Sequence, residues 1–347
     1  MKFQLGIAAS TLVLAAIITT SCGHKGAYNL KGEFDPNMEG KEVLVISMVN
    51  GDTIATTNIT DGAFLLTGEV EKPTLVQVRV GGRSVGNVIL EDGDIAFSPK
   101  AISGTPLNDI LNEYVVKNAQ AEKEYYALLS DTANDNTAAA QAIEVSFNAY
   151  TDSFMNANLN NPVGASLMLN QAYYMELAEI EKAIADNPSL GEYKKIQSIV
   201  ESKKLEAETA EGQPYKDFAV EYDGATTKLS DLMTDGHYTL VDFWASWCGP
   251  CRREIPVIKD ILAEYGPQGL NVVGVAVWDK PEDTVEAMSE LEITWPVIIN
   301  AQTVPTDLYG ILGIPTILLI GPDGTILSRG KQGDDLKAAV AEAMQAK

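Results

Sequence analysis

The distribution of hydrophobic and polar positions divides the chain into three stretches. In the first, about 27–99, short runs rich in branched and aromatic residues alternate with glycine-containing turns. The runs are EVLVISMV, AFLLTGEV, TLVQVRV and VGNVILE, and the turns are Asn50-Gly51-Asp52, Asp61-Gly62, Gly81-Gly82 and Asp92-Gly93. Such runs and turns predict a small antiparallel sandwich or barrel. No cluster of acids, bases or metal ligands stands out there, which favours a scaffold or a partner-binding module.

The second stretch, about 105–210, has helical spacing. Thr105-Pro106 and Asn161-Pro162 each combine an N-cap residue with proline at the first helical position. We expect four or five helices here, serving as a connector. A tyrosine-rich ligand groove is one interpretation of this stretch, but a packed helix face is favoured. The tyrosines are Tyr114, Tyr125, Tyr126, Tyr150, Tyr173 and Tyr174.

From about 212 onward, buried-strand patterns alternate with helical ones. The expected strands are TLVDFWAS, LNVVGVAVW, WPVII, TILLIG and TILSRG, and helices are expected over 248–265, 281–291 and 334–345. Alternation of this kind predicts an α/β layer plan with a mixed sheet. The turn at 321–324 predicts that the last two strands form an antiparallel hairpin. The expected fold is therefore multidomain: an N-terminal antiparallel β domain (22–103), a central α-helical segment (104–210) and a C-terminal α/β domain (211–347).

The first 21 residues have the pattern of an export signal. Lys2 precedes an almost wholly apolar or small stretch, 3–20, which ends at Ser21-Cys22-Gly23. TTSC resembles a bacterial lipobox, in which the cysteine becomes the lipidated first residue, although Thr19 replaces the usual leucine. The alternative is a transmembrane anchor, because about 18 apolar residues can just span a bilayer. Both place the rest of the chain outside the cytoplasm, where disulfides persist; we expect a periplasm-facing, membrane-anchored lipoprotein of the cell envelope.

The formal net charge of -23 argues against general binding to nucleic acid, because like charges repel. The chemistry then centres on WASWCGPCRREIP at 244–256, which holds two of the three cysteines. Zinc needs about four ligands, and the chain adds only His24 and His237, so no metal site is expected. A purely structural disulfide closing so short a loop would restrict the unfolded chain very little. A redox centre is the favoured interpretation.

The local pattern suits redox chemistry. The strand is expected to end near Ala245 and the helix to begin around Cys248, where the helix dipole favours a thiolate. Cys251 lies one turn later on the same face. Gly249 and Pro250 fit the first helical turn. We expect Cys248 to be the exposed nucleophile and Cys251 the buried resolving thiol.

VDFWASWCGPC closely resembles the thioredoxin active site, and GIPT at 313–316 resembles the loop with that family's cis-proline. The resemblance covers about 213–347 and implies a thioredoxin fold. It makes Ile314–Pro315 the candidate cis bond, and it places Trp247, Gly249, Pro250, Ile314 and Pro315 at the contact with substrate.

Finer features narrow the resemblance. CRREIP resembles the CxxCxxExP pattern of TlpA/ResA-like extracytoplasmic thiol–disulfide oxidoreductases, and about 272–301 resembles their inserted strand and helix. The segment 214–232 is similar to the opening of that group and of peroxiredoxins. A lipoprotein signal followed by a β-rich domain of unknown role resembles a recurrent Gram-negative arrangement.

Two carboxyl groups are candidates for proton transfer. Asp242 lies within an apolar strand, so its pKa should be raised; by resemblance it is the buried aspartate that assists deprotonation of the resolving cysteine. A structural acid paired with a lysine is the alternative. Glu254 matches the glutamate of the TlpA/ResA-like pattern, and a solvated helix residue is its alternative. Trp247 either shapes the contact surface or packs partly into the core.

The predicted function is a thiol–disulfide oxidoreductase that reduces protein disulfides outside the cytoplasm. Gly249-Pro250 between the cysteines resembles low-potential reductants. No cofactor is implied, because the disulfide itself carries the electrons. The expected partners are client proteins with disulfides, a membrane thiol reductant and the membrane that holds the lipid anchor; by resemblance, apo-cytochromes are a client class, which links the chain to cytochrome c biogenesis.

Two alternatives stay open. One is a thiol peroxidase of AhpC/TSA type, although Val241 and Ala245 occupy the places of the proline and threonine in that family's PxxxTxxC pattern. The other is a binding or tethering lipoprotein with an accessory redox domain.

Overall fold

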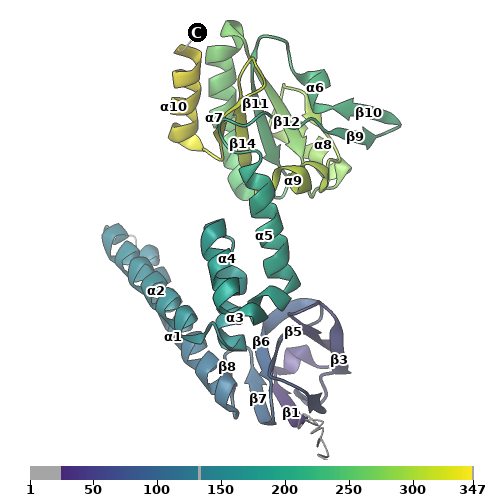
Figure 1. Ribbon diagram of the computed structural model, residues 1–347, viewed down its shortest axis with the longest axis vertical. Helices are drawn as coiled ribbons and strands as arrows, with labels where there is room; N and C mark the ends of the chain where they lie inside the picture. The colour runs from purple at the N-terminus through teal and green to yellow at the C-terminus, as the bar shows by residue number, and fades with distance from the viewer. Residues whose placement is uncertain (1–24, 132–133, 346–347) are drawn as a thin grey trace, which may run out of the picture. The chain divides into compact units, whose positions relative to one another are not determined.

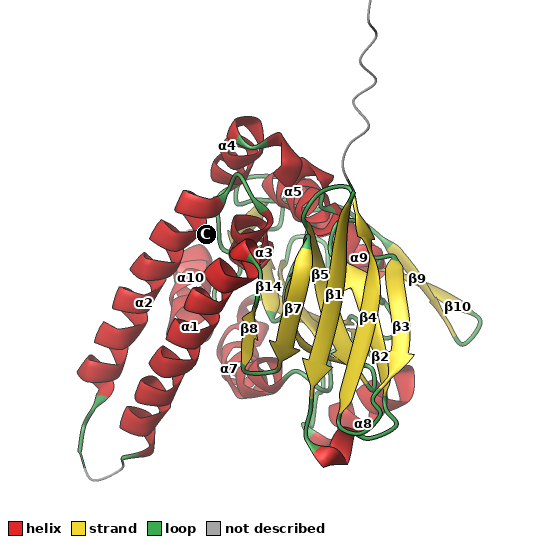
Figure 2. Cartoon of the chain, turned by 90° about the horizontal axis from the view of Figure 1, so that it is seen from below, coloured by secondary structure: helices red, strands yellow, loops and turns green. Residues whose placement is uncertain are grey.

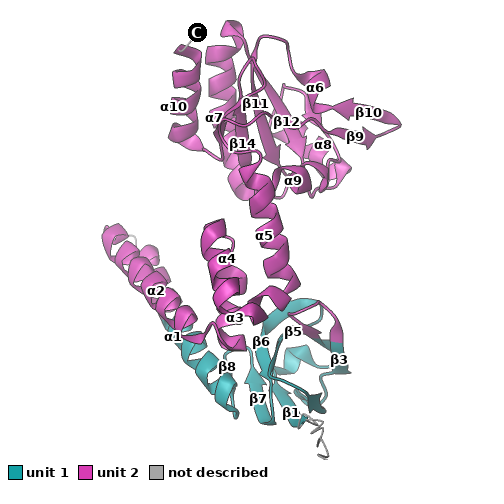
Figure 3. Ribbon diagram, in the orientation of Figure 1, with its two compact units in different colours: residues 1–45, 54–120 teal, residues 46–53, 121–347 magenta. Residues whose placement is uncertain are grey.

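A computed structural model describes residues 25–131 and 134–345. Figure 3 shows two compact units, Met1–Val45 with Ile54–Gln120, and Ile46–Thr53 with Ala121–Lys347. Cys22 and the predicted export signal lie outside the described residues. Across the described ranges, no helix is both long and apolar enough to span a bilayer. The predicted domain limits after residues 103 and 210 stay predictions.

The N-terminal β-rich region is a sandwich of two four-stranded sheets, with strand orders β4-β1-β7-β8 and β3-β2-β5-β6. Figure 2 shows β4, β1 and β7 side by side in the first sheet. The strands are β1 (Gly26–Glu33), β2 (Glu42–Ser47), β3 (Thr53–Asn58), β4 (Ala63–Val70), β5 (Thr74–Val80), β6 (Arg83–Leu90), β7 (Gly93–Ser98) and β8 (Ala101–Ser103), with a 3-10 turn at Pro36–Met38. The pairs β1–β4, β5–β6 and β7–β8 are antiparallel as predicted, but β1 and β7 pair in parallel, which the long connection between them permits.

Alternating burial explains the sandwich. In β1 every second residue is buried, including Tyr28 and Leu30, and these side chains join Val76, Val78 and Phe97 in one core between the sheets. The sequence patterns anticipated β2, β4, β5 and β6. They missed β1, β3 and β7, which are more polar and depend on their neighbours for pairing.

The described part of the central region contains five α-helices, within the expected number. They are α1 (Pro106–Ser130), α2 (Thr137–Asn158), α3 (Pro162–Gln171), α4 (Leu177–Asp186) and α5 (Lys194–Ala207), with a 3-10 turn at Pro188–Glu192 between the last two. Asn161 caps α3 as predicted, because its side chain accepts a hydrogen bond from the Val163 N–H at 2.9 Å. At α1, Thr105 and Pro106 occupy the N-cap and the first helical position as predicted, and the Thr105 carbonyl accepts from the Asp109 N–H at 2.9 Å. The side-chain acceptor is Glu91, whose carboxylate accepts from the Leu107 and Asn108 N–H groups.

The tyrosines of this region do not form one packed face. Tyr126, Tyr173 and Tyr174 are exposed, and Tyr174 is 87% accessible. The favoured packed face is therefore wrong for these three, because helical spacing alone does not say which face a neighbour covers.

The C-terminal region is an α/β domain around a mixed sheet of order β13-β12-β11-β14-β15 (Figure 1). β12 pairs with β11 in parallel, whereas β14 pairs with β11 and β15 antiparallel, so the predicted hairpin is confirmed. The elements are β9 (Ala219–Tyr222), β10 (Ala225–Lys228), α6 (Leu229–Leu232), β11 (Tyr238–Trp244), α7 (Gly249–Tyr265), η3 (Gly266–Gln268), β12 (Leu270–Ala276), α8 (Pro281–Glu290), β13 (Val297–Ile298), α9 (Val304–Tyr309), β14 (Thr316–Ile320), β15 (Ile326–Arg329) and α10 (Gly333–Gln345).

Both faces of this sheet are covered, which explains why every residue of β11 is buried. On one face, Leu240 packs with apolar residues of α7 and α10. On the other, Val241 and Phe243 pack with Tyr309 of α9 and with residues of β9 and α6. The predicted fold class is confirmed: a β-rich N-terminal region, a helical middle and a C-terminal thioredoxin-like α/β domain.

Candidate active site

The two cysteines lie where the central strand passes into a helix. β11 ends at Trp244, a short turn follows, and Cys248 occupies the N-cap of α7. Cys248 and Cys251 form a disulfide with a Cα–Cα distance of 5.3 Å, a normal value for such a bond. The Cys248 sulfur accepts a hydrogen bond from the Cys251 N–H at 3.2 Å. The helix N-terminus therefore favours negative charge on Cys248 once the disulfide is opened.

The expected exposure of Cys248 is wrong for this disulfide form. Cys251 is fully buried, as predicted, but Cys248 is also only 4% accessible. Both sulfurs belong to an apolar cluster that includes Trp244, Ala287 and the partly buried Ile314. The sequence suggested an exposed helix start, but side chains from α8 and from the loop before β14 enclose it.

The loop before β14 lies against the disulfide. The Ile314–Pro315 peptide is cis, as the resemblance implied. The carbonyl oxygen of Ile314 lies 3.7 Å from the Cys248 sulfur. A disulfide sulfur has no proton to donate, so this is a close approach in the oxidised form. The loop brings Ile314 and Pro315 to the reactive sulfur, although these residues follow Cys248 by 66 and 67 positions in the sequence.

Trp247 lies on the surface beside this site. It is 62% exposed, and its Nε1 donates to the carbonyl oxygen of Trp278 at 3.0 Å. Core packing, the alternative for Trp247, is therefore wrong. Gly249 and Pro250, in the first turn of α7, are exposed as well.

Asp279 holds the turn before Cys248, and sequence reasoning missed it. This buried carboxylate accepts hydrogen bonds from the Ser246 N–H at 2.7 Å and the Ser246 hydroxyl at 2.9 Å, and also from the Thr284 hydroxyl at 2.9 Å. Asp279 comes shortly after β12, which is parallel to β11. The carboxyl ends of adjacent parallel strands meet at one sheet edge, and that rule could have drawn attention to an acid at this position.

Asp242 is a buried acid in the middle of β11. Within the described part of the chain, neither carboxyl oxygen has a hydrogen-bond partner, so the alternative of a lysine-paired structural acid is wrong. Burial, and secondarily the nearby charge of Glu254, raises the pKa of Asp242 to about 8. The carboxyl of Asp242 is therefore largely protonated at neutral pH. It can gain or lose a proton at pH values around 8.

Glu254 lies one turn after Cys251 and is buried, so the alternative of a solvated helix residue is wrong. Its Oε1 accepts a hydrogen bond from the Gly333 N–H at 2.7 Å, at the start of α10. The two arginines between Cys251 and Glu254, both among the described residues, do not pair with this glutamate. Arg252 pairs with Glu290 at 2.6 Å, and Arg253 is exposed.

Comparison with known proteins agrees with this geometry. Residues 212–329 match the AhpC/TSA family, and residues 28–111 match a domain of unknown function (DUF4369). Thiol-disulfide oxidoreductase ResA of Oceanobacillus iheyensis is 38% identical over 112 residues, which are 32% of this chain and 57% of that relative. ResA of Geobacillus thermodenitrificans is 31% identical over 119 residues, 34% of this chain and 67% of that relative. The solved thioredoxin domain of a thiol-disulfide oxidoreductase from Bacteroides vulgatus is 28% identical and covers 38% of this chain and 96% of its own, with a TM-score of 0.34.

The chain thus spans little more than half the length of the first of these relatives. The AhpC/TSA match, residues 212–329, includes the CGPC helix start and the Ile314–Pro315 loop. By its C-terminal domain, the chain belongs to the family of ResA-like thiol-disulfide oxidoreductases with a thioredoxin-like fold.

Proposed function

We propose that the protein reduces disulfides of client proteins outside the cytoplasm, using Cys248 and Cys251 as a dithiol. The observation that carries this proposal is the Cys248–Cys251 disulfide at the N-terminus of α7, with the Ile314 carbonyl 3.7 Å from the Cys248 sulfur. A pair so placed can alternate between disulfide and dithiol without rearranging the fold.

The exchange proceeds in two displacements. The Cys248 thiolate attacks one sulfur of the client disulfide; a Cys248–client bond forms, and the other client sulfur leaves as a thiolate that takes a proton. The Cys251 thiolate then attacks the Cys248 sulfur, which re-forms the protein disulfide and releases the second client thiol. Two electrons pass to the client, so a membrane thiol reductant must return two electrons to the pair.

The surrounding residues supply electrostatics and proton transfer. The N-terminus of α7 stabilises the Cys248 thiolate through the Cys251 N–H and the helix dipole. The ionised form of Asp242 is proposed to take the proton of Cys251 when the second displacement begins, and its share grows as the pH approaches the raised pKa of about 8. Glu254 raises that pKa through its charge. Trp247, Gly249, Pro250, Ile314 and Pro315 are the proposed contacts to the client.

The reduction potential of the pair tests the direction of transfer. The protein is equilibrated with a dithiothreitol or glutathione series, and Cys251→Ser serves as a control that cannot form the internal disulfide. A value near the thioredoxin end, about -270 mV, supports a reductant. A value near the strong-oxidant end, about -120 mV, contradicts it, because such a protein would donate its disulfide instead.

Lipid attachment at Cys22 is proposed as the anchor that keeps the chain in the cell envelope, and the TTSC stretch supports it. Cys22→Ser should move the protein from the membrane fraction to the released fraction, without changing its reduction potential. Unchanged membrane retention would favour the uncleaved-anchor alternative.

The thiol peroxidase alternative is not favoured, since the two ResA relatives are thiol-disulfide oxidoreductases. Val241 and Ala245, at the places of that family's proline and threonine, are fully buried. Rapid turnover of hydrogen peroxide by Cys251→Ser would revive it.

A further inference from the structure

The end of helix α5 is built into the redox domain, although it precedes the matched segment 212–329. Gly310, directly after α9, lies against the backbone of α5: a Cβ on Gly310 would collide with the carbonyl oxygen of Ser202. Gly310 also has a φ of +62°, where glycine is favoured. The connector helix and the loop that leads to Pro315 are thus in backbone contact.

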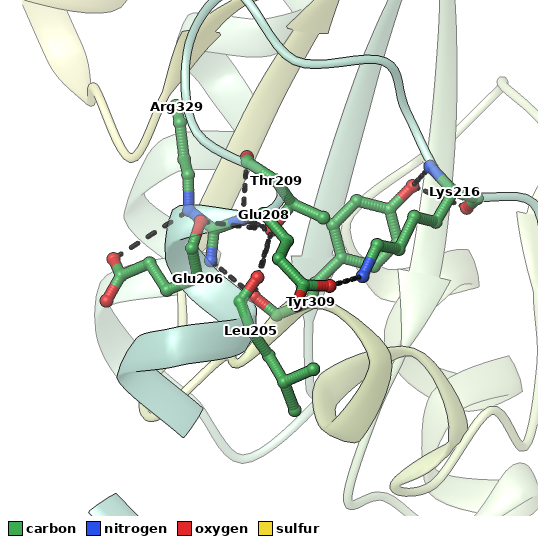
Figure 4. Close-up of polar contacts among 7 residues, drawn as sticks. All are labelled: Leu205, Glu206, Glu208, Thr209, Lys216, Tyr309 and Arg329. Atoms are coloured by element: carbon green, nitrogen blue, oxygen red, sulfur yellow. Dashed lines mark hydrogen bonds and ion pairs between the residues drawn. The ribbon is translucent and has the colours of Figure 1, made fainter. Parts of the chain in front are cut away.

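A polar network fixes this contact (Figure 4). The guanidinium of Arg329 donates to the Thr209 hydroxyl at 2.9 Å and to the Tyr309 carbonyl at 2.7 Å, and Glu206 of α5 lies 3.8 Å from its Nε. The side chain of Arg329 is only 10% exposed, so these are charge-assisted hydrogen bonds at a largely buried group. The Tyr309 hydroxyl in turn donates to the Lys216 carbonyl at 2.6 Å. α5 is therefore a fixed wall of the domain.

A groove of about 530 Å³ remains between this wall and the loop before Pro315. Its volume lies within the usual range of binding sites. The apolar and small parts of its lining include Leu177, Ala207, Ala210, Ile311, Gly313 and Thr316.

The groove adjoins the loop that lies against the disulfide. Gly313 and Thr316 line it, and the two residues between them, Ile314 and Pro315, are the cis pair beside the disulfide. The Ile314 carbonyl lies 3.7 Å from the Cys248 sulfur. Cys248 is only 4% accessible, so a client sulfur can approach it on a narrow, extended segment more easily than on a broad, rigid surface. A client segment bound along residues 313–316 would therefore extend into the groove.

We propose that the groove between α4–α5 and residues 310–316 binds the extended polypeptide segment that flanks the reactive cysteine of a client protein. This inference rests on the proposed function and adds the place and kind of substrate contact. Three carboxylates line the groove, from Glu176, Glu206 and Glu211, against two cations, Lys203 and Arg329. Together with the net charge of -23, this composition disfavours acidic segments and favours neutral or basic ones.

Peptide length provides the test. The full chain, kept in a mild detergent and reduced, is mixed with cysteine peptides disulfide-bonded to thionitrobenzoate. Attack by Cys248 releases coloured thionitrobenzoate anion, and Cys251 then releases the peptide thiol. The peptides carry a blocked cysteine alone, or the same cysteine with four neutral residues added before it or after it. We expect one of the two extensions to raise the second-order rate constant about fivefold, the gain expected from about 1 kcal/mol of added binding.

Ala207→Arg and Ala207→Glu then fill the groove with opposite charges from an exposed position at the end of α5. Each should bring the ratio of extended to short peptide rates back toward one. Ala338→Arg, at an exposed position on α10 away from the groove, is the matched control and should keep the gain.

Equal rates for all three peptides, or a gain that survives both Ala207 variants, would overturn the groove proposal. A fall of the short-peptide rate in the same proportion as the extended one would also overturn it, because the variant would then act on the redox centre. No release of thionitrobenzoate from any peptide is a separate result, which refutes the proposed function itself.

Discussion

Asp242→Asn should change how the stability of the redox domain depends on pH. Asp242 is ionised above about pH 4 in the unfolded chain, whereas burial raises its folded pKa to about 8. A carboxyl whose folded pKa is raised favours the folded state fully below the unfolded pKa, and this contribution is lost as the pH rises through the folded pKa. The stability of the unmodified domain should therefore carry a declining contribution from Asp242 between about pH 4 and pH 8.

The size of the effect follows from proton linkage. About three pH units separate pH 7 from the unfolded pKa, and each costs about 1.4 kcal/mol, so folding with a neutral Asp242 costs about 4 kcal/mol at pH 7. Asparagine cannot ionise, so the variant avoids this cost. The amide N–H₂ of the asparagine is buried instead, which lowers the unfolding free energy of the variant by about 1–3 kcal/mol at every pH. The pH slope of the difference is thus the diagnostic quantity.

Tryptophan fluorescence gives a suitable readout, because all four tryptophans, Trp244, Trp247, Trp278 and Trp295, lie in the C-terminal domain. Denaturant unfolding of the oxidised proteins is measured at half-unit steps from pH 4 to pH 9. Near pH 6 the unfolding free energy of the variant minus that of the unmodified protein should rise by about 1.4 kcal/mol per pH unit. The difference should level off above about pH 8. Parallel curves for the two proteins would refute the reasoning, since they would mean that Asp242 ionises alike in both states.

Three further changes test other parts of the site. Glu254→Gln removes a charge that raises the pKa of Asp242, so the levelling-off of the Asp242 contribution should move to lower pH in the same fluorescence titration; an unchanged or higher pH would contradict that coupling. Gly310→Ala should cost about 3 kcal/mol or more of unfolding free energy, because its Cβ meets the α5 backbone. Gly236→Ala, with a similar φ of +74° and no atom within 4 Å of a Cβ, should cost only about 1–2 kcal/mol, and equal losses would disprove the contact with α5. Asp279→Ala leaves the Ser246 N–H without its carboxylate and should cost about 2–3 kcal/mol; a loss below 0.5 kcal/mol, roughly the size of an ordinary surface change, would show that Asp279 does not hold this turn.

Local signals in the sequence predict much of the architecture. The strand at 239–246, the helix after Cys248 and the terminal helix follow from hydrophobic period and capping, which depend on residues close in sequence. Several elements escaped such reasoning, including β1, β3 and α9, because their polar or short patterns are stabilised by partners far along the chain. The carboxylate of Glu91, which accepts from the first N–H groups of α1, escaped the sequence for the same reason.

For the candidate site, the chemistry could be predicted from the sequence: two cysteines at a helix start, an acid in an apolar strand, and a proline motif some 64 residues after Cys251. The environment of each group depends instead on how distant segments pack. It buries Cys248 under Ile314, leaves Asp242 without a hydrogen-bond partner among the described residues, and brings Asp279 to the turn before the cysteines. It also places α5 against Gly310, which forms the wall of the groove. Burial, desolvation and shape depend on which distant segments come to lie side by side, and no local pattern carries that information.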